Sequence, residues 1–87
     1  MEIVFTEDAY EQIQFWKNSG NKKIQERISK LIDEILVTPY SGIGKPELLK
    51  YNLSGYWSRR INAEHRLVYY VKDDSLYIIS LRFHYDK

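Results

Sequence analysis

The sequence predicts a single α+β domain over residues 1–87, with an antiparallel sheet that includes an N-terminal strand and a two-helix hairpin packed on one face. Three observations lead to this fold. A chain of 87 residues holds one hydrophobic core and leaves no room for a second. Apolar residues recur at intervals of three and four before residue 38. Beyond residue 46 they occur in short runs that turn residues separate.

The chain is expected to begin with a strand and a helix. Residues 3–5 form an apolar run rich in β-branched and aromatic side chains, which is typical of a strand. Thr6 is a good N-cap, and Glu7 and Asp8 place acids in the turn that follows, so a helix is expected over residues 7–17. Its apolar face contains Ala9, Ile13 and Trp16, with Tyr10 beside them.

A second helix follows the polar break at residues 18–21. Asn21 can cap it, and it ends before Thr38 because a residue that precedes proline disfavours the helical region. Two such helices joined by a tight turn form a hairpin whose apolar face needs a sheet to cover. The stripe on the second helix is the strongest periodic signal in the chain and consists of Ile24, Ile28, Leu31, Ile32, Ile35 and Leu36.

The second half of the chain predicts an antiparallel meander. The segment 38–46 contains two prolines and two glycines, which indicates an ordered loop. Short turns then separate four strand-like segments, so that neighbouring strands run antiparallel. The expected strands are residues 48–53, 56–61, 65–72 and 76–83.

Composition excludes several classes of protein. No run reaches the roughly 18 apolar residues of a membrane helix, and the N-terminus lacks the features of a signal peptide, so a cytoplasmic location is expected. The chain has no cysteine, hence no thiolate metal ligand. His65 and His84 are expected on opposite faces of the sheet without a third ligand, so no metal or cofactor is predicted.

Positive charge is concentrated in the second half. Residues 1–44 carry five Lys/Arg against seven Asp/Glu, whereas residues 45–87 carry eight against five. Local positive charge next to tyrosine and tryptophan suits a phosphate-backbone partner even when the net charge is only +1. On charge alone, a solvated strand face is the slightly better explanation of the pattern.

Strand alternation gathers polar side chains on one face of the sheet. Period two separates Arg66 from the apolar face of its strand. It likewise separates Arg82 and His84 from Ile79, Leu81 and Phe83. At least one arginine of the Arg59–Arg60 pair joins the same polar face. A face that gathers Arg60, Arg66, Arg82 and His84 is a plausible anion cradle.

One Glu, one Arg and one His suffice to cut RNA. Glu47 follows Pro46 at the end of the loop, where its carboxylate could lean over the polar face. A base takes the proton from the 2′-hydroxyl, an arginine neutralises charge on the phosphate, and an acid protonates the departing 5′-oxygen. The simpler alternatives are a solvated loop carboxylate, a surface ion pair of Arg66 with Glu64 or Asp74, and an idle terminal histidine.

Four segments carry a family resemblance. They are residues 44–50 (GKPELLK), residues 52–61 (NLSGYWSRRI), residues 64–69 (EHRLVY) and the pair His84–Tyr85. Together they resemble the YoeB/Txe toxins of the RelE/ParE superfamily, and the match runs nearly end to end. The resemblance implies a RelE-like, microbial-ribonuclease-like fold. It also implies a type II toxin–antitoxin toxin that cleaves translated mRNA in the ribosomal A site and inhibits translation.

The resemblance also implies roles for individual residues. Glu47 falls on the general base, Arg66 on the phosphate-stabilising arginine, His84 on the general acid and Tyr85 on the substrate-positioning aromatic residue. No metal or cofactor is implied, because the nucleophile belongs to the substrate. The residues expected to contact RNA or phosphate are Lys45, Lys50, Arg59, Arg60 and Arg82.

The implied partners follow from the same resemblance. They are a cognate antitoxin of the YefM kind, the ribosome with its mRNA, operator DNA through the toxin–antitoxin complex, and a second copy of the chain. Leu48 stands where many relatives have proline, and Asp86 and Lys87 follow the His-Tyr pair. Two alternatives stay open. One is a non-catalytic binding toxin like the ParE branch, which poisons DNA gyrase and lacks this Glu, Arg and His set. The other is an inactive adaptor kept for antitoxin binding.

Overall fold

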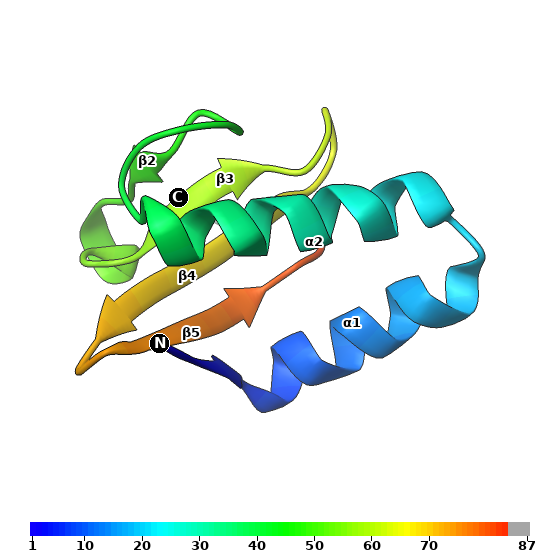
Figure 1. The fold of residues 1–87 in the computed structure, drawn as a ribbon, viewed down its shortest axis with the longest axis horizontal. Helices are drawn as coiled ribbons and strands as arrows, with labels where there is room; N and C mark the ends of the chain where they lie inside the picture. Colours follow the sequence, from blue (N-terminus) through cyan, green and yellow to red (C-terminus); the bar gives the residue numbers. More distant parts are fainter. Residues whose placement is uncertain (84–87) are drawn as a thin grey trace.

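The computed structural model describes residues 1–83 and confirms the α+β fold (Figure 1). Two helices cover one face of a five-stranded sheet with strand order β1-β5-β4-β3-β2. Within the described part of the chain, neither helix is long and apolar enough to cross a membrane. The elements are β1 (Glu2–Phe5), α1 (Glu7–Ser19), α2 (Lys22–Val37), β2 (Glu47–Leu48), the 3-10 helix η1 (Tyr51–Leu53), β3 (Trp57–Arg60), β4 (Arg66–Lys72) and β5 (Ser75–Ser80).

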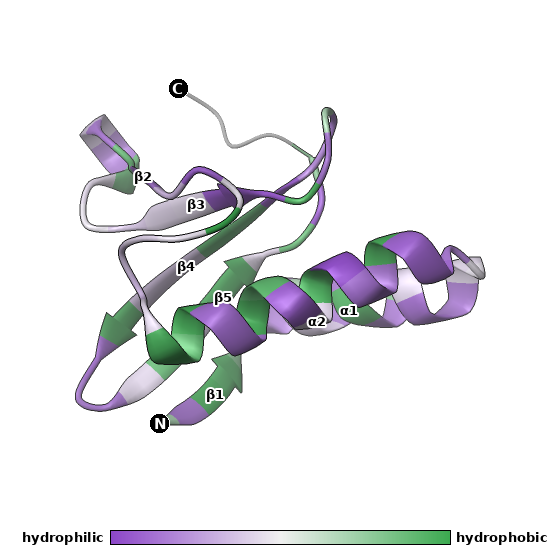
Figure 2. Cartoon of the chain, turned by 45° about the horizontal axis from the view of Figure 1, so that its top comes forward, coloured by the Kyte–Doolittle hydropathy of each residue, from purple (hydrophilic) through white to green (hydrophobic). Residues whose placement is uncertain are grey.

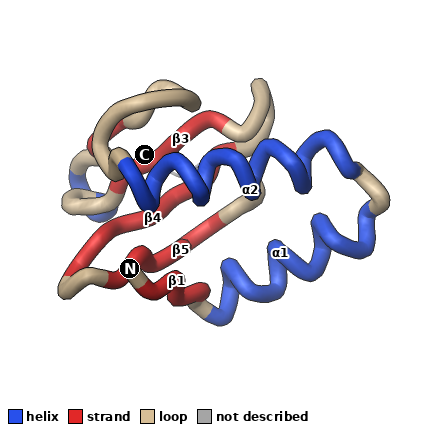
Figure 3. The backbone as a smooth tube through the Cα atoms, in the orientation of Figure 1, coloured by secondary structure: helices blue, strands red, loops and turns tan. Residues whose placement is uncertain are grey.

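The sheet is mixed, although the sequence predicts an antiparallel one. Strands β2 to β5 form the expected antiparallel meander. Strand β1 pairs with β5 in parallel, from Glu2 opposite Ser75 to Phe5 opposite Ile78. The helical hairpin carries the chain from β1 to the far edge of the sheet, and the meander then returns to β1 (Figure 3).

Local signals define both helices. The side chain of Thr6 accepts a hydrogen bond from the N–H of Ala9, and Asn21 accepts one from the N–H of Ile24. Gly20 ends α1 with a φ of 76°, in the left-handed region that glycine adopts at little cost. The predicted stripe of α2 is confirmed, with Ile24, Ile28, Leu31 and Ile35 buried and Ile32 and Leu36 packed against the core.

The apolar surface of the helices faces the sheet. Green apolar segments alternate with purple polar segments along α1 and α2 in Figure 2. Ala9 and Trp16 are buried, and Ile13 packs against them. Tyr10 is 58% exposed, so its expected place beside that apolar face is wrong.

All four strands of the meander are shorter than predicted, and the bounds of the first and last differ most. The segment 48–53 contributes only the end of β2 and then turns into η1, because Tyr51 adopts a φ of 62° that no strand contains. The last strand ends at Ser80. It contains a register shift in which Val68 pairs with Ser80 while Tyr69 pairs with Ile78.

This irregularity corrects the predicted faces of the last strand. Leu76, Ile78 and Leu81 are buried in the core, whereas the sequence predicts that Tyr77 and Ile79 share the core-facing side with Leu81. The Tyr77 ring instead stacks on Tyr70, with ring centroids 4.6 Å apart. The extra residue at Ile79 interrupts strict alternation, so the inward positions before and after it differ in parity.

The loop between α2 and β2 is built on a buried arginine. Arg59 is completely buried, and its guanidinium donates hydrogen bonds to the carbonyl oxygens of Thr38, Ser41 and Ile43. It also forms an ion pair with Glu34, 3.3 Å between Nη1 and Oε1. These contacts hold the tan loop that leads from α2 to β2 in Figure 3. The ordered loop that the sequence predicts is therefore fixed by side chains from α2 and β3.

Tyr69 completes this arrangement. Its hydroxyl accepts a hydrogen bond from Nε of Arg59 at 3.1 Å and donates one to the carbonyl of Pro39 at 2.6 Å. Burial raises the pKa of Tyr69 above its ordinary value of 10.0, and the hydrogen bond from Arg59 opposes part of that rise. The neutral phenol therefore stabilises the fold below about pH 10, and this contribution is lost as the pH rises through the pKa of the folded state.

We expect Tyr69→Phe to reduce the pH dependence of stability in alkali. Above pH 10 the wild-type free energy of unfolding should fall more steeply than that of the variant, by up to about 1.4 kcal/mol per pH unit. Urea unfolding between pH 7 and pH 11 measures the difference. Tyr51→Phe is the matched control because Tyr51 is 84% exposed. Equal slopes for the two variants would contradict the assignment.

Candidate functional site

Glu47 and Arg66 meet on the face of the sheet that the helices leave open. Glu47 lies in β2 directly opposite Ser58 in β3, and Arg66 begins β4. Nη2 of Arg66 lies 3.4 Å from Oε1 of Glu47. The Arg66 side chain is 12% exposed and the Glu47 side chain 55% exposed. The guanidinium is therefore largely enclosed, while more than half of the Glu47 side chain is exposed.

Ser58 fixes the orientation of the arginine. This serine is completely buried, and its Oγ accepts a hydrogen bond from Nε of Arg66 at 3.1 Å. Two neighbours, Ser58 and Glu47, thus hold the guanidinium from adjacent strands. The sequence alone indicates no role for Ser58. Strand alternation, which places it on the same face as Arg60, was the available signal.

Arg60 and Arg66 lie directly opposite each other on β3 and β4. The predicted polar face is confirmed for these two residues, since cross-strand partners project from the same side of a sheet. Like charges at directly opposite positions destabilise a sheet unless an anion lies between or above them. Glu47 supplies one such anion beside Arg66, while Arg60 presents its positive charge to solvent on the open face.

Arg59, by contrast, cannot contact RNA as the sequence analysis expects. Its side chain has five N–H donors. All five are matched by acceptors, namely Tyr69 Oη, Glu34 Oε1 and the carbonyl oxygens of Thr38, Ser41 and Ile43. The prediction is wrong because Arg59 lies on the core-facing side of β3, where it organises the loop before Glu47.

Arg82 packs against aromatic rings. Its guanidinium carbon lies 3.6 Å from the ring centre of Phe15 on α1 and 4.4 Å from that of Phe83. Its Nε is buried and has no hydrogen-bond partner in the described part of the chain. These contacts tie the segment after β5 to α1. The predicted phosphate contact of Arg82 stays a prediction.

Of the remaining candidate residues, two flank Glu47 in the chain and two lie outside residues 1–83. Lys45 and Lys50 are both exposed, on either side of Glu47 in the chain. Their expected RNA contacts stay predictions. His84 and Tyr85 lie outside the described residues. The carbonyl of Phe83, the last residue described, accepts a hydrogen bond from the backbone N–H of Arg66 at 3.2 Å.

Leu48 leaves the pairing of Glu47 intact. Leu49 donates its N–H to the carbonyl of Tyr56 at 2.9 Å, and hydrogen-bonded and non-bonded pairs alternate along an antiparallel ladder. The pair of Leu48 and Trp57 is therefore non-bonded, and a proline at this position would remove no bond to β3. The difference from relatives that carry proline does not alter how β2 presents Glu47.

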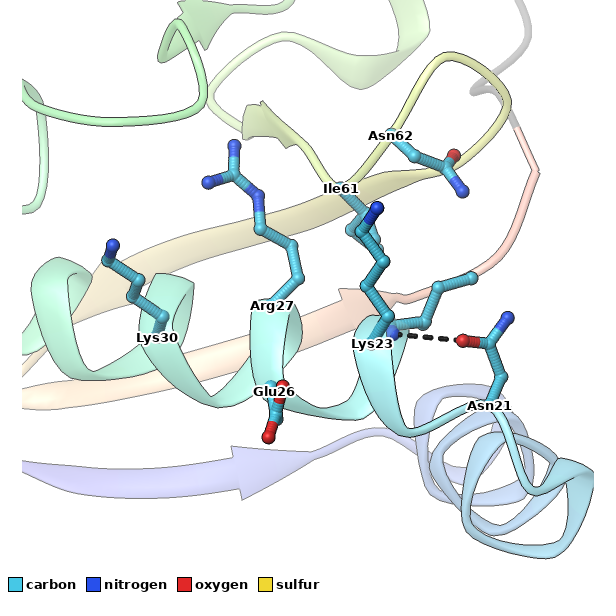
Figure 4. Close-up of a pocket in the computed structure, with 8 residues that line it drawn as sticks. Asn21, Lys23, Glu26, Arg27, Lys30, Ile61 and Asn62 are labelled. Atoms are coloured by element: carbon cyan, nitrogen blue, oxygen red, sulfur yellow. Dashed lines mark hydrogen bonds between the residues drawn. The ribbon is translucent and has the colours of Figure 1, made fainter.

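A separate cleft of about 470 Å³ lies between α2 and the turn after β3 (Figure 4). Lys23, Arg27 and Lys30 project along this side of α2, and Arg27 donates a hydrogen bond to the carbonyl of Arg60 at 3.1 Å. The cleft is basic but contains none of the predicted site residues. Within residues 1–83, no group of three or more His, Asp or Glu side chains could hold a metal ion. We therefore place the candidate site at Glu47 and Arg66.

Comparison with known proteins identifies the family. The model of the YoeB-like toxin of bacterial type II toxin–antitoxin systems matches residues 5–85. The chain belongs to the YoeB toxin family. It is also 55% identical over 87 residues to the toxin YoeB of a Synechocystis species, covering 100% of both chains. The YoeB/Txe resemblance is thereby confirmed, and the chain is a toxin of a type II toxin–antitoxin system.

Solved YoeB structures share the fold. The YoeB/ParE toxin from Agrobacterium tumefaciens superposes with a TM-score of 0.93 at 44% identity, covering 98% of this chain and 100% of that one. A heterotetrameric YoeB–YefM complex from Staphylococcus aureus gives a TM-score of 0.88, and a YoeB dimer from the same organism gives 0.89. Both are 44% identical to this chain, with 98% of each chain covered. The YoeB family match includes the positions of Glu47, Arg66, His84 and Tyr85.

Proposed function

We propose that this toxin is a ribosome-dependent endonuclease that cleaves translated mRNA in the A site and so inhibits translation. The observation that carries the proposal is the placement of the Glu47 carboxylate 3.4 Å from the Arg66 guanidinium on the open face of the sheet. A base and an anion-stabilising group at this separation can both contact the same phosphodiester and its neighbouring ribose.

The proposed reaction uses the 2′-hydroxyl of the substrate as nucleophile. Glu47 takes its proton, and the 2′-oxygen attacks the adjacent phosphorus while Arg66 stabilises the charge that develops on the phosphate oxygens. His84 protonates the departing 5′-oxygen. The products are a 2′,3′-cyclic phosphate and a 5′-hydroxyl. Tyr85 positions the nucleotide, and the reaction requires no metal because the substrate supplies its own nucleophile.

The openness of the site supports a requirement for the ribosome. Glu47 is more than half exposed and lies on a short edge strand of two residues. Such a surface does not by itself hold a flexible single strand with the 2′-oxygen in line with the scissile phosphate. Correct alignment of reacting groups is worth several orders of magnitude in rate. The A site would supply that alignment, while Arg60, Lys45 and Lys50 would contact the backbone of the mRNA.

The proposed partners include an antitoxin of the YefM kind. The complex and the dimer from Staphylococcus aureus support an antitoxin partner and a homodimer for this chain. We further propose that the toxin–antitoxin complex binds operator DNA and represses its own operon in the cytoplasm. This co-repressor role would not require the catalytic residues.

The decisive experiment is cleavage of mRNA by the purified toxin with and without programmed ribosomes. Primer extension should show cuts at codon boundaries only when ribosomes are present. Glu47→Ala, Arg66→Ala and His84→Ala should lose both these cuts and the growth arrest. Glu11→Ala and Lys72→Ala, which change exposed residues elsewhere, should keep them.

Other outcomes would overturn the proposal in distinct ways. Full cleavage by all three site variants would remove the assigned roles. Inhibition of DNA gyrase supercoiling without mRNA cleavage would favour a binding toxin of the ParE kind. Tight antitoxin binding with no cleavage on ribosomes would favour an inactive adaptor.

A further inference from the structure

We propose that His65 is a positioning residue whose imidazole holds the backbone of Phe83 against Arg66. The proposal rests on the proposed endonuclease function, because its purpose would be to align the chain just before His84 with the phosphate-stabilising arginine. His65 has no role in the reaction described above. It precedes Arg66 directly in the sequence and is buried.

Two consecutive residues, His65 and Arg66, form hydrogen bonds with the backbone N–H and carbonyl of Phe83. Nδ1 of His65 accepts a hydrogen bond from the N–H of Phe83 at 2.8 Å. The N–H of Arg66 donates to the carbonyl of Phe83 at 3.2 Å. Because one trans peptide fixes consecutive Cα atoms about 3.8 Å apart, holding Phe83 in this way limits where the next residue can begin.

The backbone of Phe83 needs such support. Its φ is 63°, in the left-handed region that a bulky aromatic residue rarely adopts. Conformations of this kind persist only where the surroundings determine them, and they are concentrated at functional sites. The 55% exposed Phe83 side chain is not buried deeply enough to fix the backbone by packing alone. The two hydrogen bonds from His65 and Arg66 therefore carry most of the constraint.

His65 is itself held rigidly. Its backbone N–H donates to Oδ1 of Asn62 at 2.7 Å, and its carbonyl accepts from the N–H of Ile61 at 3.0 Å. Its ring packs edge-on against Trp16, with centroids 5.0 Å apart and planes at 79°. Nε1 of Trp16 donates to the carbonyl of Leu81 at 2.9 Å. Two packed rings thus anchor the segment after β5 at Leu81 and Phe83.

The contact also defines the state of the imidazole. A nitrogen that accepts a hydrogen bond carries no proton, so the neutral ring of His65 has its proton on Nε2. Nε2 lies 3.6 Å from Oε1 of Glu64. A hydrocarbon side chain of similar volume would fill the space beside Trp16 but leave the N–H of Phe83 unpaired. The specific requirement at this position is therefore an acceptor at Nδ1.

The test compares two near-isosteric replacements. Asn can place its Oδ1 close to the position of Nδ1, whereas Leu fills the same space without an acceptor. We expect His65→Leu to lower the single-turnover rate of cleavage at saturating ribosome concentration by about 10- to 100-fold, because small misplacements of reacting groups cost this much. The ribosome concentration that gives half of the maximal cleavage rate should stay unchanged. His65→Asn should recover the wild-type rate to within a few-fold.

Amide hydrogen exchange of the free toxin supplies a readout that does not depend on cleavage. The Phe83 N–H should exchange faster in His65→Leu than in the wild type, and His65→Asn should restore its protection. If His65→Leu does not fold, His65→Gln replaces it, because the longer side chain places its oxygen near the Nε2 position.

The two proposals fail differently. Equal cleavage rates and equal Phe83 exchange in the Asn and Leu variants would overturn the role of His65. A wild-type toxin that does not cleave mRNA on ribosomes would overturn the proposed function, while the exchange measurement would still decide whether His65 holds Phe83.

Discussion

Arg66→Lys is expected to lower the rate of mRNA cleavage on ribosomes by about 100-fold or more, although it retains the positive charge. A guanidinium can donate to Ser58 through Nε and to Glu47 through Nη2 while it also faces a phosphate. A lysine ammonium is a single point charge without this planar array of donors. Replacement should therefore lose both the fixed orientation and the stabilisation of charge in the transition state.

Single-turnover cleavage at saturating ribosome concentration measures this loss. Arg60→Lys is the matched control, since Arg60 lies directly opposite Arg66 in the sheet but is exposed. That control should change the rate only a few-fold. Thermal unfolding of both variants shows whether the fold is intact. A rate for Arg66→Lys similar to that of Arg60→Lys would contradict the proposed transition-state role of Arg66.

Arg59→Met should destabilise the protein by about 3–5 kcal/mol, a large part of the stability of a domain of this size. The substitution removes the guanidinium donors from Glu34 and from three backbone carbonyls, although Glu34 keeps the N–H of Ile43 and the carbonyl of Ser41 keeps the hydroxyl of Thr38. It also removes one of the two hydrogen-bond partners of the Tyr69 hydroxyl, which keeps the carbonyl of Pro39. Breaking a buried ion pair by removing one member costs much more than its formation contributes, because the remaining charge is uncompensated.

Urea unfolding of Arg59→Met and Arg60→Met measures this difference. The two substitutions change neighbouring residues of β3 in the same way, but Arg60 is exposed and its replacement should change stability by no more than about 0.5 kcal/mol. Similar effects of the two would contradict the structural role of Arg59. Loss of toxicity in Arg59→Met would then reflect unfolding, whereas loss in Arg66→Lys would reflect the chemistry.

The sequence predicts most of the fold because its strongest signals are local. The stripe from Ile24 to Leu36 repeats at helical spacing, and alternation in β3 and β4 correctly places Arg60 and Arg66 on one face. The parallel pairing of β1 could not be read in this way, because it joins segments about 70 residues apart and has no local pattern.

The errors arise where distant residues decide the outcome. Arg59 lies next to Arg60 in a basic stretch, and only its contacts with the loop at residues 38–43 show that it is internal. The shift at Ile79 is equally hidden, since Ile78 and Ile79 are identical residues and either could face the core. The role of Ser58 cannot be predicted from composition, because a small hydroxyl gives no signal until its contact with Arg66 is known.

The way in which Arg59 binds the loop at residues 38–43 affects how the sequences of such toxins can diverge. Three of its five acceptors are main-chain oxygens, which every amino acid carries, so the hydrogen bonds that Arg59 donates to them do not depend on the side chains at Thr38, Ser41 or Ile43. Gly42 is different, because an added Cβ would run into Glu34. Exposed side chains of this loop can thus change among related toxins while the buried guanidinium of Arg59 keeps the main chain that leads to Glu47 in place.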